Sequence, residues 1–429
     1  MTRVGASLAR RTRRGLLALS GRRTIDLSRL DHVPQRLTWP LQRDGVDVPA
    51  RLGELRDREP VHLLTSFLGL RVWVVTGPGE ARSVLADQAA FSNDIRPYVG
   101  ANGSAADGVG GLGFTDPPEH TSLRRLLTPQ FTMRRLDRLR PTVARIVEKQ
   151  LDEMAARGPV VDLVPEFAFP VPFHVICELL GLPDDDRETF RDMSAARFDV
   201  SRGGRGTLGA VSQSRTFLIE ATRRQRAHPG DGLIGDIIRD QGDAISDVDL
   251  AGLADGVFTG GLETSANMLA LGTAILLDHP DDFRDLTAGP ERVEPIVEEL
   301  LRYLSVVQIA FPRFARHDLT LAGHRIAAGD VVICHLAGAN RSGDAPAGRD
   351  RYDAGRAASH HLAFGHGFHR CVGAELARLE LRTAYPALAR RFPDLRLAVP
   401  PDGLDFRSLS IVFGIEALPV RLDGRPSDG

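Results

Sequence analysis

Lysine and cysteine are scarce in this 429-residue chain, and each scarcity limits what the protein can be. Lys149 is the only lysine, and the net charge of -2 with a pI near 6.7 gives no sign of a nucleic-acid partner. The three cysteines are odd in number and far apart, which argues against a disulfide framework and fits a reducing cytoplasm. Cys177 and Cys334 lie in apolar runs and are expected to be inert core residues, which leaves Cys371.

Long hydrophobic runs are also missing. No stretch approaches the ~20 apolar residues that span a bilayer, so no transmembrane segment is expected. Residues 1–35 are Arg-rich, but their apolar stretch is too short for a signal-peptide core, and we expect a flexible basic leader. Hydrophobic residues make up 42% of the chain, enough for a large core, and residues 36–429 are predicted to form one domain.

The hydrophobic pattern is mainly helical, with short β-rich segments toward both ends. Residues 70–76 are typical of a buried strand, and the glycine-rich residues 94–113 of a long loop that covers a pocket. A helix is predicted to start at Asp116, whose carboxylate would cap it. Other helices are expected near 139–157, 165–180, 207–227, 247–277, 290–304 and 372–391, with short strands at 314–336 and a hairpin over 409–422.

The segment FGHGFHRCVGAELAR, residues 364–378, places Cys371 in a glycine-rich loop directly before a helix. The glycines permit a tight backbone that brings N–H groups close to the sulfur, and the helix start favours a thiolate over a thiol. Gly373, which lacks a side chain, would let the helix lie against a flat ligand. A thiolate held in this way suits a haem iron that cleaves an O–O bond.

These residues resemble the haem-binding signature of the cytochrome P450 family, which matches at Phe364, Gly365, Gly367, His369, Cys371 and Gly373. The resemblance implies the fold of that family, with haem b between a long distal helix and the helix after the cysteine loop. It implies that Cys371 is the axial ligand of the iron. It extends from about residue 42 to 422 and departs at 340–342, Asn-Arg-Ser, where the family often has Asn-Arg-Asp followed by proline.

A second group lies in the predicted helix 247–277. Thr264 follows Gly260 by four residues, so its hydroxyl can donate to the Gly260 carbonyl. Paired glycines in a helix cost roughly 1 kcal/mol each relative to alanine, and close approach of a ligand would explain them. By resemblance, Thr264 would stabilise reduced dioxygen and Glu263 would help to relay protons. This pair favours a reaction that uses O2 and electrons.

Two further groups are weak alone and gain meaning from the resemblance. Glu299 and Arg302 are neighbours on a helix, and Arg356 stands where the family completes a structural triad. His120 and Arg124 share one helix face, and with Arg313 and His369 they would bind the haem propionates, because unpaired buried charges are costly.

The resemblance also implies a pocket and a partner. The pocket would be lined by the 94–113 loop and by Gly256, Thr259, Gly260, Val307, Ile309, Ile411 and Val412, which favours a small, apolar and fairly bulky organic substrate. A ferredoxin-type donor with its reductase would supply electrons and dock on an arginine-rich face formed by Arg124, Arg125, Arg134, Arg135, Arg138, Arg140 and Arg370.

The sequence therefore predicts a cytoplasmic haem-thiolate monooxygenase that inserts one atom of O2 into an apolar substrate. Oxidative coupling or desaturation by the same cofactor remains open. A non-catalytic haem sensor would gain nothing from Glu263 and Thr264. A haem-free helical binding protein would leave His120, Arg124, Arg313 and His369 without a purpose.

Overall fold

The computed structural model describes residues 38–67, 70–97, 112–198, 205–341, 350–356, 360–407 and 409–423. The expected leader and most of the expected 94–113 loop lie outside these ranges. The described helices are α3 (Ala50–Arg58), α4 (Pro78–Ala86), α6 (Glu119–Leu127), α7 (Met133–Ala155), α8 (Pro170–Leu180), α9 (Asp184–Phe198), α10 (Arg205–Ala227), α11 (Leu233–Gln241), α12 (Asp247–Asp278), α13 (Pro280–Asp285), α14 (Pro290–Leu304), α15 (Leu336–Asn340) and α16 (Ala374–Arg391).

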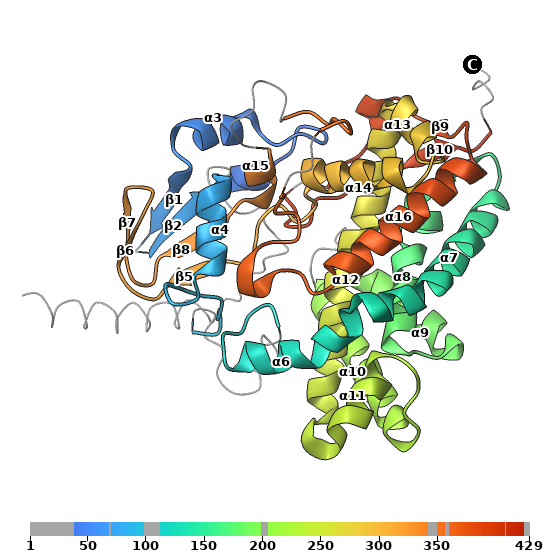
Figure 1. The fold of residues 1–429 in the computed structure, drawn as a ribbon, viewed down its shortest axis with the longest axis horizontal. Helices are drawn as coiled ribbons and strands as arrows, with labels where there is room; N and C mark the ends of the chain where they lie inside the picture. The colour runs from blue at the N-terminus through green and yellow to red at the C-terminus, as the bar shows by residue number, and fades with distance from the viewer. Residues whose placement is uncertain are drawn as a thin grey trace, which may run out of the picture.

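The strands are short and lie mainly at one side of the molecule (Figure 1). They are β1 (Val61–Phe67), β2 (Leu70–Val75), β3 (Phe91–Ser92), β4 (Val160–Asp162), β5 (Arg313–Ala315), β6 (Leu319–Leu321), β7 (His324–Ile326), β8 (Val331–Cys334), β9 (Arg396–Leu397) and β10 (Pro419–Arg421). One sheet has the order β1-β2-β8-β5-β3, with β2 and β8 parallel. Strands from distant parts of the sequence therefore share one sheet.

Helix α12 runs through the helical part of the molecule, where it packs against α8, α10 and α16 (Figure 1). Its start follows from local chemistry, because the Ser246 hydroxyl accepts from the Asp249 N–H at 3.1 Å and Asp247 and Asp249 lie in the first turn. Its second half, from Ser265 to Leu276, is buried throughout. The first half of α12 is less buried, and the exposed residues Gly256 and Gly260 lie there.

The mainly helical fold with a smaller β-rich part is confirmed, and the long predicted helices occur within a few residues of their expected bounds. Among the described residues, no helix combines the length and apolar character that a membrane crossing requires.

Two local predictions are wrong. Helix α6 begins at Glu119, because the Asp116 carboxylate accepts from the Asn93 N–H at 2.8 Å and pairs with Arg316 at 2.6 Å instead of capping a helix. Residues 409–422 do not form a hairpin of their own. Strand β10 pairs instead with β4 and β9, which bury Val420 between them.

His335, at the start of α15, is buried and joins the N-terminal segment to the sheet. Its Nε2 donates to the Pro40 carbonyl at 2.6 Å, and its Nδ1 accepts from the Gly338 N–H at 2.9 Å. Burial lowers the pKa of His335 from 6.5 to about 4. The folded protein therefore keeps this ring neutral where the unfolded chain would protonate it.

We expect the free energy of unfolding to fall as the pH drops from 6.5 toward 4, because the unfolded chain then binds a proton that folded His335 excludes. Above pH 6.5 the ring is neutral in both states and contributes no pH dependence. The limiting slope for one such group is about 1.4 kcal/mol per pH unit. Urea unfolding across this window should give a flatter profile for His335→Gln and an unchanged one for exposed His317→Gln. Equal slopes for all three proteins would contradict the assignment.

Candidate functional site

The loop before α16 holds Cys371 by backbone contacts. Gly365 and Gly367 both have φ of +68°, and a Cβ on Gly367 would lie 2.6 Å from the Leu85 carbonyl oxygen, so only glycine fits there. The Cys371 N–H donates to the Phe364 carbonyl at 2.9 Å. Gly373 is the residue before α16, and its backbone N–H acts to lower the pKa of the Cys371 thiol. The predicted tight loop and the helix start that follows it are confirmed.

The three cysteines differ in their surroundings. Cys177 and Cys334 are buried, which raises the pKa of each to about 12, so the prediction of inert core thiols is confirmed. Cys371 is accessible, yet desolvation by the surrounding chain raises its pKa. The Gly373 N–H and the charges of Arg370, Arg124 and Arg378 act in the opposite direction. An accessible but poorly hydrated thiol with cationic neighbours is suited to binding a metal.

Helix α12 presents an open face at Gly256, Gly260 and Thr264, which are spaced by four residues. Both glycines are exposed, and a Cβ on either would meet no atom within 4 Å. The Thr264 hydroxyl donates to the Gly260 carbonyl at 2.8 Å, as the spacing predicts. One turn earlier, the Thr259 hydroxyl donates to the Asp255 carbonyl at 2.7 Å. The glycines therefore leave backbone open to a ligand in the middle of a long helix.

Glu263 has a partner that the sequence pattern did not reveal. Its carboxylate accepts from Arg407 at 3.1 Å, and Arg407 lies 144 residues later in the chain. The side chain that the sequence predicts to relay protons is thus tied to a part of the chain that follows α16.

Four nitrogen donors gather beside the cysteine loop. His120 is fully buried, and its ring centroid lies 4.1 Å from that of His369. Burial lowers the pKa of His120 to about 4 and that of His369 to about 3, with Arg124 and Arg313 adding to the effect. Neither ring nitrogen of His120 has a hydrogen-bond partner among the described residues. Arg313 is buried too, and one of its N–H groups donates to the Phe311 carbonyl at 2.9 Å.

These donors fit the carboxylates of the haem that the sequence predicts. Buried nitrogens without partners are costly, and an anion would satisfy them. Burial lowers the pKa of the Arg124 guanidinium, and within the described ranges no carboxylate is ion-paired with it. Together with the accessible Cys371 and the open glycines of α12, these residues fit haem, which is flat, carries a metal and has two carboxylates.

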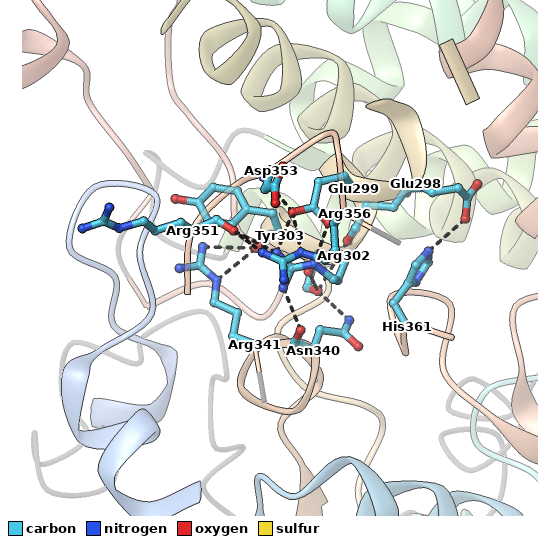
Figure 2. A network of polar contacts seen from close by, with 12 residues as sticks. Glu298, Glu299, Arg302, Tyr303, Asn340, Arg341, Arg351, Asp353, Arg356 and His361 are labelled. Carbon is cyan, nitrogen blue, oxygen red and sulfur yellow. Dashed lines mark hydrogen bonds and ion pairs between the residues drawn. The ribbon is translucent and has the colours of Figure 1, made fainter. Parts of the chain in front are cut away.

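Glu299, Arg302 and Arg356 form the predicted triad (Figure 2). Arg302 donates twice to the Glu299 carboxylate, each time at 2.7 Å, and Arg356 approaches the same carboxylate at 3.3 Å. Arg302 also donates to the Asn340 and Arg351 carbonyls. The network joins α14 to residues 350–356 and is a structural element.

Asn340 and Arg341 belong to the same network, although the resemblance departs at this point (Figure 2). Arg341 is 1% exposed, and it donates to the Tyr303 carbonyl and pairs with Asp47 at 2.6 Å. Asn340 donates to Ser305 and accepts from the Leu362 N–H, just before the cysteine loop. Asn340 and Arg341 therefore make their contacts although the sequence departs from the family pattern at this point. Residues 342–349 lie outside the described ranges.

Glu298 is a second carboxylate that sequence reasoning missed. It accepts from Arg378 at 2.7 and 2.9 Å. It also contacts His361 at 3.1 Å (Figure 2). Burial alone would raise its pKa, but the hydrogen bonds from His361 and Arg378 hold that pKa well below its usual range. The Arg378 guanidinium lies 4.7 Å from the centre of the Phe364 ring. Only its position next to Glu299 could have drawn attention to Glu298.

The expected pocket residues come from three segments. Val307 and Val412 form an antiparallel bridge, and Ile309 bridges to His335. Ile411 is 46% exposed, which is unusual for isoleucine. Gly256, Thr259 and Gly260 come from α12. The structure therefore brings Val307 and Val412 together and leaves Ile411 accessible.

The arginine-rich face is partly neutralised. Arg135 pairs with Asp236 at 2.7 Å, Arg140 with Asp137 at 3.0 Å, and Arg370 approaches Glu375 at 3.7 Å. Arg125, Arg134 and Arg138 are exposed on α6 and α7.

Comparisons with known proteins agree with this geometry. A family model described as cytochrome P450 matches residues 57–228 and 291–402, more than half of the chain. Cytochrome P450 165C4 of Amycolatopsis orientalis is 43% identical over 79% of this chain and 84% of its own length. Vitamin D3 dihydroxylase of Streptomyces griseolus is 40% identical over 87% of this chain and 93% of its own length.

Solved structures match over most of the chain as well. OxyE, a cytochrome P450 involved in teicoplanin biosynthesis, superposes with a TM-score of 0.82 at 39% identity, over 89% of this chain and 99% of its own. OxyC, implicated in an oxidative C–C coupling reaction during vancomycin biosynthesis, gives a TM-score of 0.79 at 39% identity, over 88% of this chain and 95% of its own.

We expect Glu299→Gln to destabilise the fold by about 3–5 kcal/mol, because it leaves the Arg302 guanidinium buried without its counter-ion. Denaturant unfolding of the holoprotein measures the change. Glu294→Gln on the same helix is the matched control, since Glu294 is 63% exposed where it pairs with Arg382 and should matter by no more than about 1 kcal/mol. Equal losses in the two variants would show that the triad has no structural role.

Proposed function

The chain belongs to the cytochrome P450 family and is a haem-thiolate monooxygenase, and from that premise we propose that Cys371 is the residue whose sulfur holds the iron. The accessible position of Cys371 just before the start of α16, in a tight loop that requires glycine at position 367, carries this proposal. A sulfur at the N-terminus of a helix is stabilised as a thiolate. When bound, the haem activates dioxygen for transfer of one oxygen atom to the substrate.

We propose haem b as the form of the cofactor, held through its two propionates by His120, Arg124, Arg313 and His369. The unpartnered ring nitrogens of His120 and the desolvated guanidinium of Arg313 support this assignment. Charge-assisted hydrogen bonds from these groups would offset the cost of burying two carboxylates. Phe364, Gly365 and Gly373 would shape the wall behind the sulfur.

The reduced protein treated with carbon monoxide should show the red-shifted absorption band of haem-thiolate proteins, and Cys371→Ser should lose that band. Cys334→Ala is the matched control, because Cys334 is a buried core thiol whose replacement leaves the site intact. A band that survives in well-folded Cys371→Ser would overturn the assignment of the ligand.

We further propose that Thr264 and Glu263 manage protons. Two protons accompany two electrons when one oxygen atom enters the substrate and the other leaves as water. The Thr264 hydroxyl lies on the open face of α12, where it can shift its hydrogen bond from the Gly260 carbonyl to a ligand. Glu263, next to it and 23% exposed, can exchange protons with solvent and acts as the source.

Thr264→Ala should lower the product formed per electron consumed by roughly tenfold or more, because protons then arrive without control. Thr264→Ser, which keeps the hydroxyl, should retain most of the yield. Thr273→Ala removes an equivalent hydroxyl that bonds the Leu269 carbonyl in the buried part of α12, and it should leave the yield unchanged. Electron and product counts in one assay give the ratio. An unchanged ratio in Thr264→Ala would refute the role.

The substrate that we propose is a small, apolar and fairly bulky organic molecule. Exposed Ile411 and the Val307–Val412 bridge supply apolar surface, and Gly256 and Gly260 leave the backbone of α12 open. Candidate compounds can be screened by the low-to-high-spin shift that they cause when they displace water from the iron.

Oxidative coupling is the second candidate, and the structural similarity to OxyC favours it. Desaturation would use the same site. Mass spectrometry of the product separates insertion from the other two outcomes, since insertion adds one oxygen atom whereas coupling within one molecule or desaturation removes two hydrogens.

As electron donor we propose an acidic ferredoxin with its reductase, and as location the cytoplasm. Exposed Arg125, Arg134 and Arg138 leave positive charge on α6 and α7 for docking. The lack of disulfide pairing among the three cysteines fits a reducing compartment.

A further inference from the structure

Glu298 on α14 and Arg378 on α16 form a doubly hydrogen-bonded ion pair. The Arg378 Nε donates to one Glu298 oxygen at 2.7 Å, and a terminal N–H group donates to the other at 2.9 Å. The His361 ring contacts the second oxygen at 3.1 Å (Figure 2). Only 14% of the Arg378 side chain and 29% of the Glu298 side chain are exposed. Two parallel hydrogen bonds fix the guanidinium, and water screens a pair so enclosed less than it screens a surface pair.

The fixed guanidinium lies over the cysteine loop. Its carbon is 4.7 Å from the centre of the Phe364 ring, and the Phe364 carbonyl accepts from the Cys371 N–H at 2.9 Å. Another N–H group of Arg378 donates at 2.9 Å to Glu375, which lies in the first turn of α16. The aromatic ring and Glu375 therefore hold the same cation from two further directions. Arg378 is thus held next to the residue that binds the Cys371 backbone.

Arg382, one turn later on α16, shares the same carboxylate. It donates to Glu298 at 3.1 Å and to Glu294 at 2.9 Å, and its side chain is 31% exposed. The charge of Arg378 acts to lower the pKa of the Cys371 thiol. One helix therefore carries two arginines bound to one carboxylate, and Arg378 is the one that lies over the cysteine loop.

We propose that the Glu298–Arg378 pair sets the reduction potential of the iron, with Arg378 supplying positive charge to the Cys371 sulfur and Glu298 limiting that charge. The inference rests on the proposed role of Cys371 as iron ligand. One electron from the donor converts ferric to ferrous iron and adds one negative charge to the iron and its ligand. A nearby cation favours the reduced form, and the counter-ion of that cation opposes it. Both are positioning residues, because they act through the cysteine loop.

The test measures the midpoint potential of the holoenzyme by spectroscopic titration with dithionite. Arg378→Gln removes the cation and should lower the equilibrium constant for reduction by about threefold or more, which is about 28 mV at 59 mV per tenfold. Arg378→Lys keeps the charge and should retain most of the wild-type potential. Glu298→Gln keeps an oxygen that accepts from Arg378 but removes the negative charge, and it should raise the constant by about twofold. The double variant should lie between the two single variants.

Glu294→Gln and Arg382→Gln are the matched controls. Each makes the same change of charge on the same helix, one turn away from the pair, at side chains that are 63% and 31% exposed. Water screens these charges more strongly, so both controls should keep the wild-type potential. Shifts in the controls as large as those in the pair would overturn the proposal. A lower potential in Glu298→Gln would overturn it too, because Glu298 would then only keep Arg378 in place. If Arg378→Gln does not fold, the rise in Glu298→Gln still decides.

The reduced, carbon monoxide-bound spectrum separates this inference from the proposed role of Cys371. Every variant should keep the red-shifted band, because Cys371 is unchanged. If the wild-type protein lacks the band, the role of Cys371 as ligand fails and the inference fails with it. If every protein shows the band and the potentials are all equal, Cys371 remains the ligand and the role of the Glu298–Arg378 pair fails.

Discussion

The constraint on which the proposed site depends is the cost of ionising the Cys371 sulfur, which the role of iron ligand requires, against the desolvation of the thiol by the surrounding chain. Desolvation raises the pKa of the thiol, and a bare thiolate in that setting would take up a proton. The backbone offsets part of this cost through the Gly373 N–H at the start of α16. Arg370, Arg124 and Arg378 supply positive charge. The tight loop from Gly365 to Gly373 places the sulfur where these groups can act on it.

Arg378, one of the arginines whose charge acts on the sulfur, is held in place by a carboxylate of α14. The neighbouring carboxylates of α14, Glu298 and Glu299, serve different parts of the molecule (Figure 2). Glu299 binds Arg302 and Arg356 and so fixes residues 350–356. Glu298 binds Arg378, which lies over the Phe364 ring in the cysteine loop. Helix α14 thus orders both the segment before the cysteine loop and the helix after it.

Contacts between residues that are close in the chain could be predicted from the sequence, whereas contacts between residues far apart in the chain could not. Long helices follow from hydrophobic spacing and from capping residues such as Ser246, and the bond from Thr264 to Gly260 follows from a separation of four residues. The roles of His120, Arg313 and Arg356 came from family resemblance. Contacts across the chain had no local signal, and so Glu298–Arg378 and Glu263–Arg407 were missed. Asp116 was misassigned for the same reason, because its partners Asn93 and Arg316 are distant in sequence.

The residues that break local rules lie on the side of the molecule that a ligand must reach. Gly256 and Gly260 weaken a helix whose other half is fully buried, and His120 buries two nitrogens without partners. An anionic ligand would supply the partners that the His120 nitrogens lack, and the glycines would let that ligand approach the backbone of α12. The pair of Glu263 and Arg407 is a different case, because the two charges meet within the chain and, being partly exposed, stabilise it little. A carboxylate proposed to exchange protons with solvent is better held by such a weak, partly exposed contact than by a buried one like Glu299–Arg302.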